Sequence, residues 1–360
     1  SGYTYSWSPS GSTGSSITNV ASGSYTLTVT DSKACVKSQT TTLTQPSALL
    51  AIPSVTNESC NYLNNGIASI TVSGGTAGYT YQWLPGLQTT TSINSLSAGA
   101  YTLQVTDSHG CVTTTVALVS EPSVLSINLN NQINVSCFGG SNGSISSSGL
   151  GGTPNYSYSW LPGGSTNAVL SGVQAGTYSL TVTDAKSCQT QTTVVITQPP
   201  VMSIISTATN VSCNGGNNGA LTTTVSGGTS PYAYLWLNTG QTSSGTNNLG
   251  AGIYTLQVTD AKGCVTTHTT TVTEPTVLNV SLTGTNVSCF NGSTGSVSST
   301  VSGGTSGYTY SWSPGGSTGS SITNVVSGAY TLIVTDSKGC VKSQTTTLTQ
   351  PSALLAIPSV

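Results

Sequence analysis

The chain has 360 residues, of which only 4% are charged, and its formal net charge is −2. So little charge leaves no electrostatic footprint for nucleic acid or for an anionic membrane surface. The longest apolar run, residues 48–52, is far shorter than the roughly 20 residues that a membrane-spanning helix needs, so we expect no direct membrane insertion.

The first elements of the chain introduce a pattern that returns throughout it. Tyr3, Tyr5 and Trp7 occupy alternate positions, Gly23-Ser24-Tyr25 follows about twenty residues later, and Val-Thr-Asp then leads to Cys35. The same order recurs every 76 or 77 residues, and each period ends at a Gln or Glu that precedes a proline. Self-similarity at a fixed period indicates a tandem array of one structural unit.

The first complete period, residues 46–121, shows what each unit contains. Its alternating apolar residues predict six strands, at 49–55, 67–73, 79–83, 90–96, 101–105 and 112–119. Gly74-Gly75 and 84–86 mark turns, and no segment has helical periodicity. The fold class is therefore all-β, with tandem immunoglobulin-like β-sandwich modules of about 76 residues and six to seven strands each.

The period divides the chain into modules whose boundaries we predict at the prolines. They are a partial module at 1–45, repeat modules at 46–121, 122–198, 199–274 and 275–350, and the start of a next module at 351–360. Residues 1–55 and 306–360 differ at only five positions, so four modules form a larger repeat of 305 residues. We expect the chain to be a segment of a longer array.

Nine cysteines follow the same period, with alternating gaps of 25 or 26 and 51 residues. They are Cys35, Cys60, Cys111, Cys137, Cys188, Cys213, Cys264, Cys289 and Cys340. Pairing is open between the two ends of a long gap, within a module, and the two ends of a short gap, across a junction. If six strands alternate in direction, both cysteines of a module lie at the same end, within bridging distance.

This geometry favours disulfides within modules. The predicted pairs are Cys60–Cys111, Cys137–Cys188, Cys213–Cys264 and Cys289–Cys340, with Cys35 paired to a cysteine outside the chain. Such staples suit small modules and imply an oxidising, extracellular setting. Zinc is the alternative use of cysteine, but the two histidines do not recur in register, so we predict no metal and no cofactor.

The tyrosines and tryptophans of the strands are predicted to fill the cores, because residues two apart on a strand share one face. An exposed row of aromatic rings that stacks on sugars is the alternative. The predicted core aromatics are Tyr81, Trp83, Tyr101, Tyr158, Trp160, Tyr178, Tyr234, Trp236, Tyr254, Tyr310, Trp312 and Tyr330.

Each period carries one regular carboxylate, just before its second cysteine. A calcium site needs six to eight oxygen ligands, so a single Asp is expected to form a turn instead. Neither paired carboxylates nor a recurring Ser-His-Asp set is present, and we predict that the chain is not an enzyme and has no catalytic residues. The five carboxylates are Asp31, Asp107, Asp184, Asp260 and Asp336.

The joint spacing of these motifs resembles the SprB-type repeat of Bacteroidetes cell-surface adhesins. The resemblance rests on Asn-Val-Ser-Cys at 210–213, Gly-Gly-Thr at 227–229, Tyr-x-Tyr-x-Trp at 232–236, Ala-Gly-x-Tyr at 251–254 and Val-Thr-Asp-x-x-Gly-Cys at 258–264. Asn57-Glu58-Ser59, Ala34 and Ser187 depart from it. It implies a protein exported by the type IX system and displayed on the cell surface, where relatives serve gliding motility.

Modules joined by a proline without a flexible linker predict a structural shaft that spaces an adhesive tip from the cell. The expected partners are neighbouring modules of the same chain, with other copies of the filament or a surface polysaccharide as further candidates. Polysaccharide binding by the modules and self-assembly into fibres or sheets are the alternative functions. One difficulty remains, because six alternating strands return the chain to the end where it began and so favour a zigzag.

Overall fold

The computed structural model describes residues 2–356, and its strands follow the predicted period. Residue 1 and residues 357–360, which belong to the predicted partial modules at the two ends, lie outside the described residues. Contacts divide the chain into two compact units. Unit 1 comprises Ser1–Asn130, Ser146–Leu170 and Tyr178–Val194, and unit 2 comprises Asn131–Ile145, Ser171–Thr177 and Val195–Val360.

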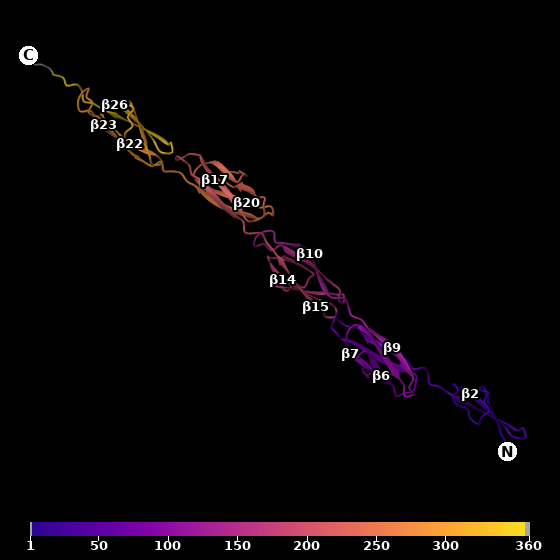
Figure 1. Ribbon diagram of the computed structural model, residues 1–360. Helices are drawn as coiled ribbons and strands as arrows, with labels where there is room; N and C mark the ends of the chain where they lie inside the picture. Colours follow the sequence, from indigo (N-terminus) through magenta and orange to yellow (C-terminus); the bar gives the residue numbers. More distant parts are fainter. Residues whose placement is uncertain (1, 357–360) are drawn as a thin grey trace, which may run out of the picture. The chain divides into compact units, whose positions relative to one another are not determined.

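Within residues 2–356, the strands occur as one set of three followed by four sets of six, and Figure 1 shows the members of a set gathered together, as for β6, β7 and β9. The set of three is β1 (Thr4–Ser8), β2 (Gly23–Thr30) and β3 (Val36–Leu43). The first set of six is β4 (Leu50–Thr56), β5 (Gly66–Ser73), β6 (Thr80–Leu84), β7 (Ser92–Leu96), β8 (Gly99–Thr106) and β9 (Val112–Val119).

The other three sets repeat this order of strand lengths. The second is β10 (Ser126–Ile133), β11 (Gly143–Leu150), β12 (Ser157–Leu161), β13 (Val169–Val173), β14 (Gly176–Thr183) and β15 (Gln189–Ile196). The third is β16 (Ser203–Thr209), β17 (Gly219–Ser226), β18 (Ala233–Trp236), β19 (Gly245–Leu249), β20 (Gly252–Thr259) and β21 (Val265–Val272). The fourth is β22 (Asn279–Thr285), β23 (Gly295–Ser302), β24 (Thr309–Ser313), β25 (Ser321–Val325), β26 (Gly328–Thr335) and β27 (Val341–Leu348).

Each set of six forms two three-stranded antiparallel sheets. In the first set the sheets are β4-β5-β7 and β6-β8-β9, so the chain changes sheet between β5 and β6, between β6 and β7, and again between β7 and β8. The set of three forms the single sheet β1-β2-β3. The prediction of an all-β fold of tandem two-sheet modules with disulfides is thus confirmed, with six strands in each complete set.

Strand directions in the first set follow from its register. At one end, which we call the proximal end, Leu50 pairs with Ser73 and Thr80 with Thr106. At the other, the distal end, Gly66 pairs with Leu96. Strands β4, β6, β7 and β9 therefore all run from the proximal to the distal end, and β5 and β8 run back.

The expectation that all six strands alternate in direction is therefore wrong. Strands β6 and β7 are two short halves of one crossing of the module, because β6 covers the proximal part in one sheet and β7 the distal part in the other. With this split strand counted once, the module crosses five times. The chain enters at the proximal end and leaves at the distal end, which removes the reason to expect a zigzag.

The buried tryptophan fixes the place where the chain changes sheet. Trp83 is fully buried, and its indole Nε1–H donates to the carbonyl of Thr90 at 2.9 Å, just before β7 begins. Backbone bonds from Trp83 N to Gln88 O and from Leu87 N to Trp83 O close the connecting loop. The same indole bond recurs from Trp160 to Asn167, Trp236 to Ser243 and Trp312 to Gly319.

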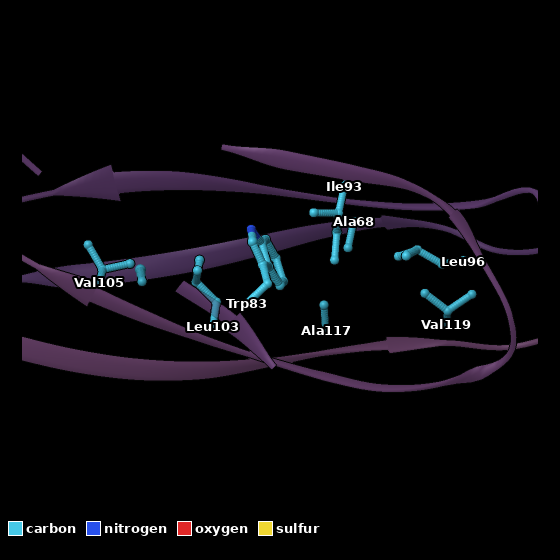
Figure 2. Close-up of a cluster of buried hydrophobic side chains, with 9 residues drawn as sticks. Ala68, Trp83, Ile93, Leu96, Leu103, Val105, Ala117 and Val119 are labelled. Carbon is cyan, nitrogen blue, oxygen red and sulfur yellow. The ribbon is translucent and has the colours of Figure 1, made fainter. Parts of the chain in front are cut away.

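The core of each module lies between its two sheets, as Figure 2 shows for the first complete set. The Trp83 ring sits in the middle of the row, with Val105 towards one end and Leu96 and Val119 towards the other. The other predicted core tryptophans, Trp160, Trp236 and Trp312, are also buried.

The predicted core tyrosines divide into two groups. Tyr178 and Tyr330 are buried. The other six are half-buried at the edge of the core, and they are Tyr81, Tyr101, Tyr158, Tyr234, Tyr254 and Tyr310. The hydroxyls of Tyr101, Tyr254 and Tyr330 donate to the carbonyl four residues earlier, at 2.9 to 3.0 Å. Each such ring therefore packs inward while its hydroxyl anchors the turn before its strand, as in a tyrosine corner.

Candidate functional site: the disulfide junctions

Three disulfides join cysteines of successive sets of strands. They are Cys60–Cys188, Cys137–Cys264 and Cys213–Cys340, with Cα–Cα distances of 5.7, 5.6 and 5.6 Å. Each bond links the first cysteine of one predicted module to the second cysteine of the next, 127 or 128 residues further along the chain. Every short gap and every long gap of the cysteine ladder is thus left unbridged.

The predicted pairs within modules are therefore wrong. Cys60 is not bonded to Cys111, Cys137 not to Cys188, Cys213 not to Cys264, and Cys289 not to Cys340. The physical reason is the split strand. With five crossings instead of six, the loop after β4 lies at the distal end and the turn before β9 at the proximal end, so one eight-residue strand, roughly 27 Å long, separates them.

Three cysteines carry no disulfide in the structure, and all three are exposed. They are Cys35, Cys111 and Cys289. A bond from Cys35 to a cysteine outside the chain stays a prediction.

The loop that carries the first cysteine is held rigidly by asparagines. Beside Cys213, the Asn210 Oδ1 accepts a hydrogen bond from the backbone N–H of Thr273 at 3.0 Å, which ties the loop to the end of the last strand. Across the loop, Asn218 Oδ1 accepts from the Ser212 N–H at 2.9 Å, and its Nδ2 donates to the Ser212 Oγ at 2.8 Å. The Asn of the Asn-Val-Ser-Cys motif thus fixes the loop against its own module.

The Gln or Glu that closes each period holds the same loop from the other side. The Glu274 Oε2 accepts from the backbone N–H of Gly215, two residues after Cys213, at 2.6 Å. Gln and Glu are interchangeable here because only an Oε acceptor is used. The equivalent bonds join Glu121 to Tyr62, Gln198 to Gly139 and Gln350 to Asn291.

This role of Gln and Glu was missed by the sequence analysis. The signal was present, because an acid and its amide alternate at one position of the period, as Glu121, Gln198, Glu274 and Gln350. An alternation that preserves the acceptor oxygen but not the charge indicates a hydrogen bond to a donor such as a backbone N–H.

The second cysteine follows a turn that the regular Asp organises, as predicted. Asp107 Oδ1 accepts from the backbone N–H groups of His109 and Cys111, both at 2.9 Å, and its Oδ2 accepts from the Thr76 N–H at 2.9 Å. These donors, with that of Thr76 foremost, lower the pKa of Asp107 from its ordinary value. The equivalent Asp184, Asp260 and Asp336 make the same three bonds.

The Asp turn therefore joins the two sheets at the proximal end and presents the cysteine there. The asparagine and Gln or Glu contacts present the other cysteine at the distal end. Successive modules can then be bonded by placing a distal end against the next proximal end. An open hollow at such a junction is lined by Phe138, Met202 and Asp260, together with the bonded pair Cys137 and Cys264.

Within residues 2–356, no group of three or more His, Cys, Asp or Glu side chains is placed to hold a metal ion. No helix formed by the described residues is long and apolar enough to span a bilayer.

The fold and the junctions define a class of protein: a tandem array of β-sandwich modules cross-linked by disulfides, which is an extracellular repeat protein. The SprB repeat family matches the chain at residues 52–88, 129–165, 205–241 and 281–317. The matches begin 76 or 77 residues apart, and this regular spacing supports a SprB-type repeat array. A repeat array of this fold fits a non-enzymatic structural protein.

Solved structures of other multidomain proteins are similar at low identity. The eight N-terminal immunoglobulin domains of Down syndrome cell adhesion molecule are 13% identical, with a TM-score of 0.30, covering 97% of this chain and 69% of that one. Three N-terminal domains of the outer capsid protein Hoc of bacteriophage RB49 are 16% identical, with a TM-score of 0.33, covering 64% and 99%. Domains 1–6 of surface layer protein SbsC are 13% identical, with a TM-score of 0.23, covering 99% and 63%. No curated protein sequence matches the chain.

Proposed function

We propose that the chain is part of the structural shaft of a long filamentous adhesin on a cell surface. The observation that carries this proposal is the pairing of distal and proximal ends by Cys213–Cys340 and the equivalent bonds. A module through which the chain passes from end to end, bonded at both ends, adds its full length to a row. Export by a type IX system, a Bacteroidetes source and a part in gliding motility come from the SprB-type resemblance and belong to the same proposal.

The geometry of the aromatic residues favours a spacer over a polysaccharide-binding module. Sugar binding by stacking needs exposed ring faces, whereas Trp83, Trp236 and Trp312 are buried and the tyrosines of the same strands pack against the core. The polar surface is rich in threonine pairs such as Thr26–Thr40 and Thr331–Thr345, whose hydroxyls bond to each other across the strands at 2.9 and 2.8 Å. These hydroxyls already have partners within their own sheet.

Two measurements on the full chain test the proposal. A glycan array should show no saturable binding, and negative-stain images should show single threads. A variant that lacks residues 199–274 keeps the spacing of the remaining cysteines, because Cys137 then precedes Cys340 by the same number of residues as it precedes Cys264 in the intact chain. Its threads should be shorter by at least one strand length, roughly 27 Å.

The other outcomes separate the alternatives. Saturable binding of a polysaccharide would replace the spacer by a binding module. Bundles or sheets on the grid would favour self-assembly. Threads of unchanged length after the deletion would contradict the end-to-end row.

A further inference from the structure

The disulfides give each junction a second covalent connection beside the backbone. Between the third and fourth sets of strands, the backbone passes through Glu274 and Pro275, and the Cys213–Cys340 bond joins the same two modules. The third set is also bonded backwards, through Cys137–Cys264. Tension along a row of modules therefore reaches the second and third sets at two points each and leaves each of them at two points.

Within a module, these four points are joined by only two short stretches of chain. In the third set, one runs from Pro199 through β16 to Cys213, and the other from Cys264 through β21 to Pro275. Both β16 and β21 run from the proximal to the distal end. The middle strands β17 to β20 lie between Cys213 and Cys264 and are not part of either direct connection.

The same distinction divides all the segments between successive cysteines into two kinds. The short segments, 35–60, 111–137, 188–213 and 264–289, each contain the last strand of one set and the first strand of the next. The disulfides connect the short segments to one another in two interleaved series. In one series, the bond from Cys60 to Cys188 leads into segment 188–213, and the bond from Cys213 to Cys340 leads out of it. The long segments, 60–111, 137–188, 213–264 and 289–340, hang from these series as side loops.

We propose that the short segments form a double covalent tether that carries tension along the row and shields the sandwich cores from unfolding by force. A strand rises about 3.3 Å per residue, and a fully stretched chain reaches at most about 3.6 Å, so a tether made mostly of strands lengthens by only about one tenth. The tether becomes taut before β17 to β20, or their equivalents, can be pulled out. This inference deepens the proposed shaft function and adds to it that the shaft is inextensible.

Pulling single molecules of the full chain by peptide tags at its two ends tests the proposal. The shortest covalent route between the two ends of the chain passes through the Cys60–Cys188 and Cys213–Cys340 bonds. It has 59 residue steps from residue 1 to Cys60, 25 from Cys188 to Cys213 and 20 from Cys340 to residue 360, which makes 104 steps. The reduced chain has 359 steps. At about 3.5 Å per step, the fully stretched lengths are about 360 Å and about 1,250 Å, so reduction should lengthen the chain about 3.5-fold.

Paired variants show which bonds limit the length. Replacing both cysteines of the middle bond (C137S with C264S) should leave the oxidised length unchanged, because the shortest route does not use that bond. Replacing both cysteines of the last bond (C213S with C340S) forces the route back from Cys188 to Cys137 and on through Cys264, which gives 206 steps and about twice the length. All samples carry serine at the three free cysteines, so that no other pair can form.

The outcome that overturns the proposal is equally definite. With serine at positions 111 and 289, bonds within modules are limited to Cys137–Cys188 and Cys213–Cys264 and would give 257 steps, from segments of 136, 25 and 96, which is about 2.5 times the expected length. An oxidised chain that stretches as far as the reduced one would also overturn it. Neither result depends on what the shaft supports, and a glycan-binding result that removes the spacer function would leave the measured lengths as they are.

Discussion

Glu58 is a buried carboxylate at a position where the other modules bury valine. It is 5% exposed, and the equivalent Val135, Val211 and Val287 are 3%, 4% and 3% exposed. One carboxylate oxygen, Oε2, accepts from the Asn64 N–H at 2.8 Å, but Oε1 is buried without a hydrogen-bond partner. We predict that Glu58→Val stabilises the first complete module.

The size of the effect follows from three contributions. Removing an unsatisfied buried polar atom gains about 1–3 kcal/mol, and burying a valine side chain gains about 1.5 kcal/mol. The Asn64 N–H loses its acceptor, which costs about 1 kcal/mol at most because Asn64 is exposed and water replaces the bond. The expected net gain is about 2 kcal/mol, which raises the midpoint of thermal unfolding of a module this small by about 10 °C.

Differential scanning calorimetry of the full chain, with limited proteolysis to identify the module that melts, measures this shift. The reciprocal change, Val211→Glu, places the same carboxylate in the third set of strands and should lower the midpoint of that module. If Glu58→Val left the midpoint unchanged or lowered it, the carboxylate would have a stabilising partner and the reasoning would be refuted.

Three further changes probe the core, the sheet packing and the Asp turn. Trp236→Ala should lower the free energy of unfolding of its module by about 3–5 kcal/mol in urea titrations. Trp7→Ala is the control and should lower it clearly less, because Trp7 is half-buried and its strand belongs to a single sheet. Equal losses would contradict the two-sheet core. Gly219→Ala should destabilise its module by about 1–3 kcal/mol, because the added Cβ would lie 2.8 Å from both Leu249 O and Val272 Cγ1. Gly252→Ala is the control and should be nearly neutral, because its Cβ would make only ordinary van der Waals contacts. Backbone N–H donors, with that of Thr305 first, lower the pKa of Asp336 in the folded protein, so the stabilisation that its carboxylate gives is complete above about pH 4 and is lost as the pH falls through that lowered pKa. Asp336→Asn should therefore remove this part of the loss of stability in acid. An unchanged dependence of stability on pH in the variant would exclude this role of Asp336.

Much of the fold could be predicted because periodicity reports which residues share a face. The last strand, predicted at 112–119, is β9 at Val112–Val119, and Ala68, Ile70 and Val72 face the core as expected. The tandem tryptophans were also correctly assigned to the core. Alternation along a strand fixes the inward side chains, and that information is local.

Strand direction is not local, and there the prediction failed. Periodicity is the same whether the chain reverses or continues after the loop at 85–91, so nothing in the alternation shows that β6 and β7 run the same way. That single ambiguity caused both errors, the zigzag and the pairing of Cys60 with Cys111. The side chain that resolves it is Trp83, whose indole bond to Thr90 O holds the loop open between the sheets.

The separation of the two cysteines of a module also sets an order of events during maturation. In an unfolded chain, Cys60 has a closer potential partner in Cys111, 51 residues away, than in Cys188, 128 residues away. Once a module has folded, its own two thiols are held at opposite ends and only a neighbour's thiol can reach. We therefore expect folding to precede the formation of the native disulfides, so that each of them joins two modules that have already reached their final structure.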